Sequence, residues 1–153
     1  MIYIPEVFMS IGFLIILIIS VFVKKNQNIV LGYLSLLLIF LTQFFVLKDI
    51  FLFEEIFNNF FVIDSFSSFL KSVILICAGF VIYFYLIVKN DPSLNRPEFP
   101  MVILISIIGM MLMVSSNDLL SLFVSIELQS LALYILVSFS REDFNSSEAG
   151  VKY

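Results

Sequence analysis

The sequence predicts an all-α integral membrane protein with about five transmembrane helices and the start of a sixth. Hydrophobic residues make up 61% of the 153 residues and charged residues 13%, which is too little polar surface for a soluble domain. The hydrophobic residues fall in five long runs separated by short polar segments. A run of about 20 apolar residues crosses a bilayer as a helix. We therefore expect residues 1–153 to form a single multi-span membrane domain.

The first two spans are predicted at about 7–23 and 29–47. Pro5 and Glu6 precede the first span and suit the first turn of a helix. Proline there lacks only a donor that would be unpaired anyway, and an acid meets the positive end of the helix dipole. A pair of lysines follows the first span and ends it.

The segment 48–64 mixes phenylalanines with acids and is predicted to be an interfacial loop, or a short helix in the headgroup plane. Glu54 and Glu55 are adjacent carboxylates, a pair that can perform acid–base chemistry or bind a metal. Because no other polar residue converges on them in sequence, a solvated loop is favoured over a site.

The third and fourth spans are predicted at about 65–88 and 100–114, on either side of a proline-rich polar loop. Lys71 lies less than two turns inside the third span. A lysine at that depth can extend its side chain to the interface, which we favour over a buried functional role. The methionines of the fourth span are interpreted as adaptable packing residues.

The fifth span runs to about Phe139 and follows a tight turn at 115–118, so the fourth and fifth spans should form an antiparallel pair. Asn117 or Asp118 is the candidate N-cap. Glu127 lies near the midpoint of this span, about 15 Å from either interface at 1.5 Å rise per residue. An ionisable group at that depth is expensive and indicates function.

Polar residues form two stripes on the fifth span, at the helical spacings i, i+3, i+7, i+11 and i, i+4, i+8. The first stripe is Glu127, Ser130, Tyr134 and Ser138, and the second is Ser121, Ser125 and Gln129. This pattern favours a helix enclosed by protein on more than one side. The serines are interpreted as residues that hold helices together, and Glu127 as a functional group.

Asn145 and Glu148 have the spacing of a capping box, which predicts the start of a sixth helix that carries Lys152. The lysines and arginines fall mainly on one side of the five spans. The polar segments on that side hold Lys24, Lys25, Lys89, Arg96, Arg141 and Lys152. The positive-inside rule then places the N-terminus outside and the C-terminus in the matrix or cytoplasm.

The sequence offers few residues for a bound cofactor. One cysteine, Cys77, and no histidine exclude a disulfide or zinc framework and make haem or copper sites of the usual kind improbable. No glycine-rich phosphate loop occurs. Nineteen phenylalanines and no tryptophan indicate an AT-rich genome, as organelles often have.

Three motifs in 115–153 closely resemble NADH dehydrogenase subunit 2, the antiporter-like membrane subunit of respiratory complex I, in its mitochondrial form. They are Asn-Asp-Leu-Leu, Ile-Glu-Leu-Gln-Ser and Glu-Ala-Gly-Val-Lys-Tyr. Pro5-Glu6 and the segment 64–71 are compatible with the same family. The resemblance implies the N-terminal portion of an antiporter-like bundle, in a non-redox subunit of proton-translocating NADH:ubiquinone oxidoreductase. NADH, FMN, iron–sulfur clusters and ubiquinone would act elsewhere in the complex.

The resemblance also implies a location and a site. The location is the mitochondrial inner membrane, N-terminus in the intermembrane space and C-terminus in the matrix, with the bacterial plasma membrane as the alternative. Glu127 matches a family glutamate in a chain of buried charges that translocates protons, and Lys152 matches a lysine early in the sixth span. A further family lysine, on the seventh span, lies beyond this chain. An opposite charge about 6 Å away stabilises a buried charge by about 3 kcal/mol at an effective dielectric constant of about 20.

The chain is therefore expected to be a fragment or one piece of a split subunit. Its expected partners are other membrane-arm subunits, lipids and a second polypeptide that places a buried lysine near Glu127, and not nucleic acid. Two alternatives remain open. One is a subunit of a related cation/proton antiporter or membrane-bound hydrogenase. The other is a structural membrane anchor, for which replacement of Glu127 would be tolerated.

Overall fold

A computed structural model describes residues 4–23, 27–49, 54–56, 60–87, 96–139, 148–150 and 152. Five long helices follow one another with a short β-hairpin between the second and the third. Their bounds are α1 Ile4–Phe22, α2 Gln27–Asp49, β1 Glu54–Ile56, β2 Phe61–Ile63, α3 Ser65–Ile87, α4 Glu98–Ser115 and α5 Leu119–Val137. All five helices are long and apolar enough to cross a membrane. The predicted fold class is confirmed, and each span lies within a few residues of its predicted bounds.

Local hydrogen bonds explain where α3 and α5 begin. The Asp64 carboxylate accepts a hydrogen bond from the Ser67 backbone N–H at 2.7 Å, and the Asp64 backbone N–H donates to the Ser67 hydroxyl at 3.0 Å. Asp118 is the N-cap of α5, and its carboxylate accepts from the Leu120 N–H at 3.3 Å. Both carboxylates pair N–H groups that have no partner inside the helix.

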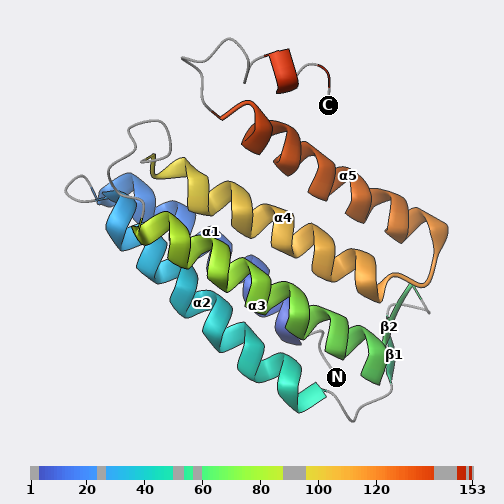
Figure 1. Cartoon of the computed structure of the whole chain (residues 1–153). Coiled ribbons are helices and arrows are strands. Elements are labelled where there is room, and N and C mark those ends of the chain that lie inside the picture. Colours follow the sequence, from blue (N-terminus) through green and yellow to red (C-terminus); the bar gives the residue numbers. More distant parts are fainter. Residues whose placement is uncertain are drawn as a thin grey trace.

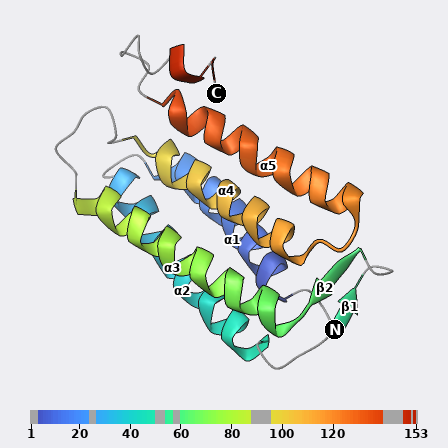
Figure 2. The same ribbon diagram turned by 45° about the vertical axis from the view of Figure 1, so that its right-hand side comes forward.

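The first four helices form an antiparallel bundle, and α5 lies beside it (Figure 1). Both α1 and α3 pack against α2 and α4, so α1 and α3 occupy opposite corners of the bundle. The helix α5 packs along α4, on the side away from α2 (Figure 2). The bundle is filled by large side chains that are fully buried, among them Met9, Leu31, Leu75, Ile82, Leu104, Ile107 and Met111. The packing role expected for the methionines of the fourth span is confirmed for Met111.

The bundle has two distinct ends. We call the end that contains the β-hairpin, the start of α1 and the α4–α5 turn the hairpin end (Figure 2). The other end, where α1 and α3 finish and α4 begins, is called the opposite end. The hairpin is tied to the α4–α5 turn, because the Asn117 N–H donates to the Phe60 carbonyl at 2.9 Å and Phe61 forms a β-bridge with Ser116.

The hairpin corrects the expectation for 48–64, where a loop or a short helix was predicted. In the described part of this segment, 54–56 pairs antiparallel with 61–63. Aromatic and β-branched residues at 61–63 favour a paired strand. The pairing also satisfies backbone groups that a loop would leave to solvent. The Glu54 and Glu55 side chains lie outside the described residues.

A glycine sets the distance between α4 and α5. A methyl group added at Gly109 would lie 2.8 Å from the backbone nitrogen of Gln129. The two helix backbones therefore approach closely at this point, as small residues allow in membrane proteins. By contrast, a methyl group at Gly79 on α3 would meet Ile39 at 3.9 Å, an ordinary contact.

Candidate functional site

Glu127 lies in the middle of α5, on a face that the other described helices do not cover. When the chain is considered without lipid or other subunits, the Glu127 side chain is exposed. Large apolar side chains on this outward side are also exposed, including Phe123, Val124, Leu131 and Tyr134. In a membrane such a surface meets either lipid or another protein segment. A carboxyl group at this depth is unfavourable against lipid.

The second polar stripe of α5 faces α4. Ser121 and Ser125 are 7% and 2% exposed, and Gln129 lies against Gly109. The Ser125 hydroxyl donates to the Ser121 carbonyl of its own helix at 2.7 Å. The Ser121 hydroxyl also lies 3.2 Å from the Phe60 carbonyl and so connects α5 to the hairpin. One stripe is therefore enclosed within this chain, whereas the stripe with Glu127 faces outward.

Lys152 lies near the end of α5 and is highly exposed. Its ammonium group pairs with the Glu148 carboxylate one turn earlier. Residues 148–150 and 152 are helical, as the capping-box pattern predicts, and Gly150 lies against Ser138. Asn145 lies outside the described residues. Within the described part of the chain Lys152 pairs with Glu148 and not with Glu127, so a joint role of Lys152 and Glu127 stays a prediction.

A second pair of intramembrane charges lies inside the four-helix bundle at the hairpin end. The Lys71 Nζ atom on α3 is 2.6 Å from the Glu6 Oε1 atom on α1, and the two side chains are 2% and 4% exposed. The Ser115 hydroxyl on α4 lies 3.4 Å from the same carboxylate oxygen. The expectation that Lys71 reaches water at the interface is wrong. Its side chain ends on a buried carboxylate of another helix.

The pattern of residues on α3 could have indicated from the sequence that Lys71 is buried. The buried face of α3 consists of small and polar residues with a few aliphatic ones, whereas its phenylalanines point outward. The buried residues are Ser67, Ser68, Lys71, Ser72, Leu75, Ala78, Ile82 and Leu86. In membranes the small and polar face of a helix turns toward other helices. That pattern places Lys71 inside, although it does not identify Glu6 as its partner.

Asp64 lies just before α3, beside this pair. The Ser67 hydroxyl, which hydrogen-bonds to its carboxylate, lowers the pKa of Asp64 below its ordinary value. The positive charge of Lys71 acts in the same direction with a smaller effect. The hairpin end therefore contains an acid near its surface, then a buried lysine, then a buried acid.

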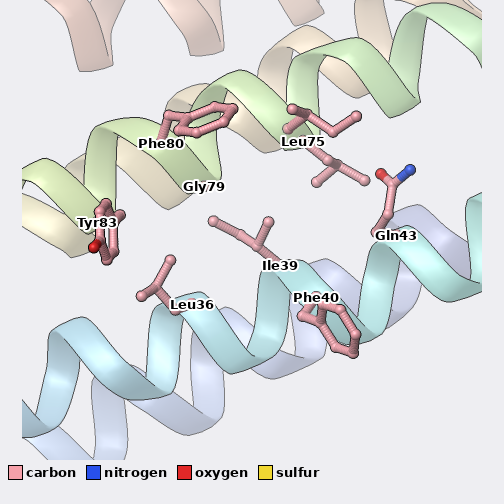
Figure 3. Close-up of a pocket in the computed structure, with 9 residues that line it drawn as sticks. Leu36, Ile39, Phe40, Gln43, Leu75, Gly79, Phe80 and Tyr83 are labelled. Atoms are coloured by element: carbon pink, nitrogen blue, oxygen red, sulfur yellow. The ribbon is translucent and has the colours of Figure 1, made fainter.

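A groove lies between α2 and α3 and has a volume of about 530 Å³. Side chains of both helices line it, and Leu36, Ile39 and Tyr83 lie between the two helices (Figure 3). The other labelled lining residues are Phe40, Gln43, Leu75, Gly79 and Phe80. Tyr83 is 55% exposed, and Cys77 is exposed as well. Because the lining is apolar apart from the Gln43 amide and the Tyr83 hydroxyl, the groove offers no converging charges.

Known proteins resemble this chain over nearly its whole length. Residues 116–153 match the family described as NADH:quinone oxidoreductase/Mrp antiporter, TM. NADH-quinone oxidoreductase subunit N of Pelagibacter ubique (strain HTCC1062) is 39% identical over 151 residues, which is 97% of this chain and 32% of that protein. Subunit N of Bartonella bacilliformis is 36% identical over 152 residues, 97% of this chain and 30% of that protein. The chain belongs to the subunit N family of antiporter-like membrane subunits.

The subunit N relatives also bear on the predictions that the chain is part of a longer subunit and that it is mitochondrial. The chain spans about a third of the length of the relatives that it matches. These relatives are bacterial, as is subunit N of Parvibaculum lavamentivorans, which is 35% identical over 149 residues. The resemblance to the complex I family is confirmed, whereas the specifically mitochondrial form stays a prediction. The matched family segment, 116–153, contains both Glu127 and Lys152.

Proposed function

We propose that this chain is the N-terminal part of a non-redox membrane subunit of NADH:ubiquinone oxidoreductase that takes part in proton translocation. The match to subunit N over 97% of the chain supports the assignment to that complex. The position of Glu127 in the middle of α5, on the outward face of that helix, is the observation that supports a proton-carrying role. NADH, FMN, iron–sulfur clusters and ubiquinone would be bound by other subunits.

Glu127 would need a partner from outside α1–α4. A carboxylate in the middle of a membrane is stabilised by a nearby cation or by an internal water path. Since its face of α5 is uncovered by the described helices, the part of subunit N that the relatives possess in addition would lie there and contribute a buried lysine. Making and breaking such a pair would load and release a proton. Lys152 would act in the same relay at the end of α5.

Replacing Glu127 with glutamine tests this role. Glu127→Gln keeps the shape and hydrogen-bonding capacity but cannot titrate, so the complex should assemble while the proton-to-electron ratio falls. Ser130→Ala is the matched control, because Ser130 lies on the same stripe and its hydroxyl bonds the Glu127 backbone carbonyl at 3.1 Å. Lys152→Met should show a smaller loss, because Lys152 is highly exposed. An assembled Glu127→Gln complex with unchanged turnover and pumping would refute the role.

A subunit of a cation/proton antiporter is the second candidate, because the description of the matched family names both complexes. NADH-dependent quinone reduction by the purified assembly that contains this chain favours the first candidate. Cation-driven proton exchange without quinone reduction favours the second. A structural anchor is distinguished by the Glu127→Gln result, since an anchor does not depend on a titratable group.

The proposal also includes an orientation. The hairpin end would face the intermembrane space of a mitochondrion, or the outside of a bacterial cell, because most basic residues in the polar segments belong to the opposite end. Glu98 and Asn117 are exposed residues at the opposite end and the hairpin end. In a Cys77→Ser background, a membrane-impermeant thiol reagent added outside sealed membranes should label Asn117→Cys and leave Glu98→Cys unlabelled. The reverse pattern would overturn the orientation.

A further inference from the structure

The buried pair of Glu6 and Lys71 is separate from the Glu127 site. It lies on α1 and α3 at the hairpin end, whereas Glu127 lies in the middle of α5. Burying two charges costs more in desolvation than a well-packed apolar pair would, and their attraction does not necessarily repay that cost. Helix packing alone therefore gives no reason for an ion pair at this place.

One oxygen of this pair has no hydrogen-bond donor among the described residues. Lys71 and Ser115 both approach Oε1 of Glu6, whereas Oε2 is fully buried and without a partner. The Ser115 hydroxyl has a single hydrogen, which also lies within reach of the Met111 carbonyl at 3.1 Å. A buried carboxylate oxygen is normally paired. At Oε2 the missing donor would be a water molecule or a proton on the carboxyl group itself.

The surroundings of the pair connect it to one side of the membrane. Glu6 lies in the first turn of α1, and the Lys71 side chain extends toward the start of α3, as helical side chains do. Asp64 at the start of α3 is a charged group that acts on Lys71. The helix α4 contributes the Ser115 hydroxyl, and α2 faces α1 one turn further in with Thr42, which lies 3.8 Å from Met9.

We infer that Glu6 and Lys71 form a second proton-exchanging site, which takes up a proton at Glu6 Oε2 from water at the hairpin end and returns it there. Uptake forms one O–H bond, turns the carboxylate into a carboxylic acid and changes the net charge of the pair from zero to plus one. Release breaks that bond and restores the ion pair. This inference rests on the proposed function, since it adds a site to the same proton-translocating subunit.

Lys71→Arg separates proton exchange from a purely structural ion pair. A guanidinium keeps the positive charge and can donate to both carboxylate oxygens at once, so it would occupy Oε2 and hold Glu6 charged. A structural pair predicts wild-type behaviour for this variant. Proton exchange predicts that a pH-dependent carboxyl signal in infrared difference spectra of the intact complex is lost in Lys71→Arg, as in Glu6→Gln. The proton-to-electron ratio should stay at the wild-type value in Lys71→Arg, because the site returns its proton to the side from which it came.

The double variant Glu6→Gln/Lys71→Met covers the case in which arginine does not fit. It removes both charges at similar volume, so a complex should assemble without a buried unpaired charge. The inference predicts that this complex lacks the carboxyl signal and keeps the wild-type proton-to-electron ratio. A wild-type carboxyl signal in either assembled variant would overturn the inference. If Glu127→Gln lowers pumping while these variants keep the wild-type signal, the second site fails alone, whereas unchanged pumping in Glu127→Gln refutes the proposed function.

Discussion

Glu6 and Glu127 are both carboxyl groups on apolar membrane helices, yet one is buried in an ion pair and the other is exposed. Glu6 is 3% exposed and is held by Lys71 at 2.6 Å. Glu127 is exposed on a face that no other described helix covers. The bundle thus contains the partner of the first charge, whereas the described helices provide none for the second. The residue type alone does not distinguish the two cases.

The helices that carry or border these charges differ in the same way. The span of α4 is buried over 56% of its length and that of α5 over 17%. The bundle of α1–α4 surrounds α4, whereas α5 has α4 on one side and an apolar, exposed surface on the other. An exposed apolar face with a carboxyl group at its centre fits a protein neighbour better than lipid.

The largest expected effect on the free energy of unfolding comes from breaking the buried pair of Glu6 and Lys71. Lys71→Leu leaves Glu6 as an unpaired buried charge, and breaking such a pair costs about 3–5 kcal/mol. Thermal unfolding of the purified subunit in lipid nanodiscs measures the loss. The double variant Glu6→Gln/Lys71→Leu should recover most of it. If Lys71→Leu is as stable as the wild type, Glu6 is not held as a charge by Lys71.

An intermediate effect is expected at the contact between α4 and α5. Gly109→Ala places a methyl group 2.8 Å from the Gln129 backbone nitrogen, and overpacking of this kind costs about 1–3 kcal/mol. Gly79→Ala is the matched control, because its methyl group meets Ile39 at 3.9 Å and should be nearly neutral. Equal unfolding temperatures for the two variants would show that α5 can move away from α4 without cost.

A smaller effect is expected at the start of α3. Asp64→Ala removes the cap of this helix and should cost about 1 kcal/mol, whereas Asp64→Asn still caps and should cost less. The Ser67 hydroxyl lowers the pKa of Asp64. The ionised carboxylate therefore stabilises the fold at neutral pH, and this contribution is lost as the pH falls below about 4. Unfolding of wild type and Asp64→Asn between pH 7 and pH 3 should converge, and a constant difference would contradict the assignment.

The smallest expected effect is on the folding of the five helices when Glu127 is made apolar. Glu127→Leu should change the unfolding temperature of this chain by the equivalent of less than about 0.5 kcal/mol, as exposed substitutions do. The same substitution in the assembled complex should remove proton translocation. Strong destabilisation of the chain by itself would mean that Glu127 has a partner within α1–α5, which would break the contrast with Glu6.

The features that were predicted correctly from the sequence depend on residues that lie close together along the chain. Run lengths placed the five spans, and Asp118, one of the two predicted N-cap candidates, could be found because capping involves residues two positions apart. The depth of Glu127 follows from counting along one helix. The hairpin at 54–63 was missed because pairing of short strands depends on the nearby α4–α5 turn. The burial of Lys71 against Glu6 was missed because a lysine side chain at this depth can reach either water or another helix.

The sequence by itself determined the five membrane-spanning helices of the described residues and the place of Glu127 in the middle of the fifth, because both follow from hydropathy and from the fixed rise of a helix. Only the tertiary structure decided which faces meet. It brought Glu6 to Lys71 across 65 positions of sequence and left Glu127 on the outside. The physical reason is that the depth of a residue depends only on its position along one helix. Its contact with a partner depends on the placement of two helices and on the rotation of each about its axis.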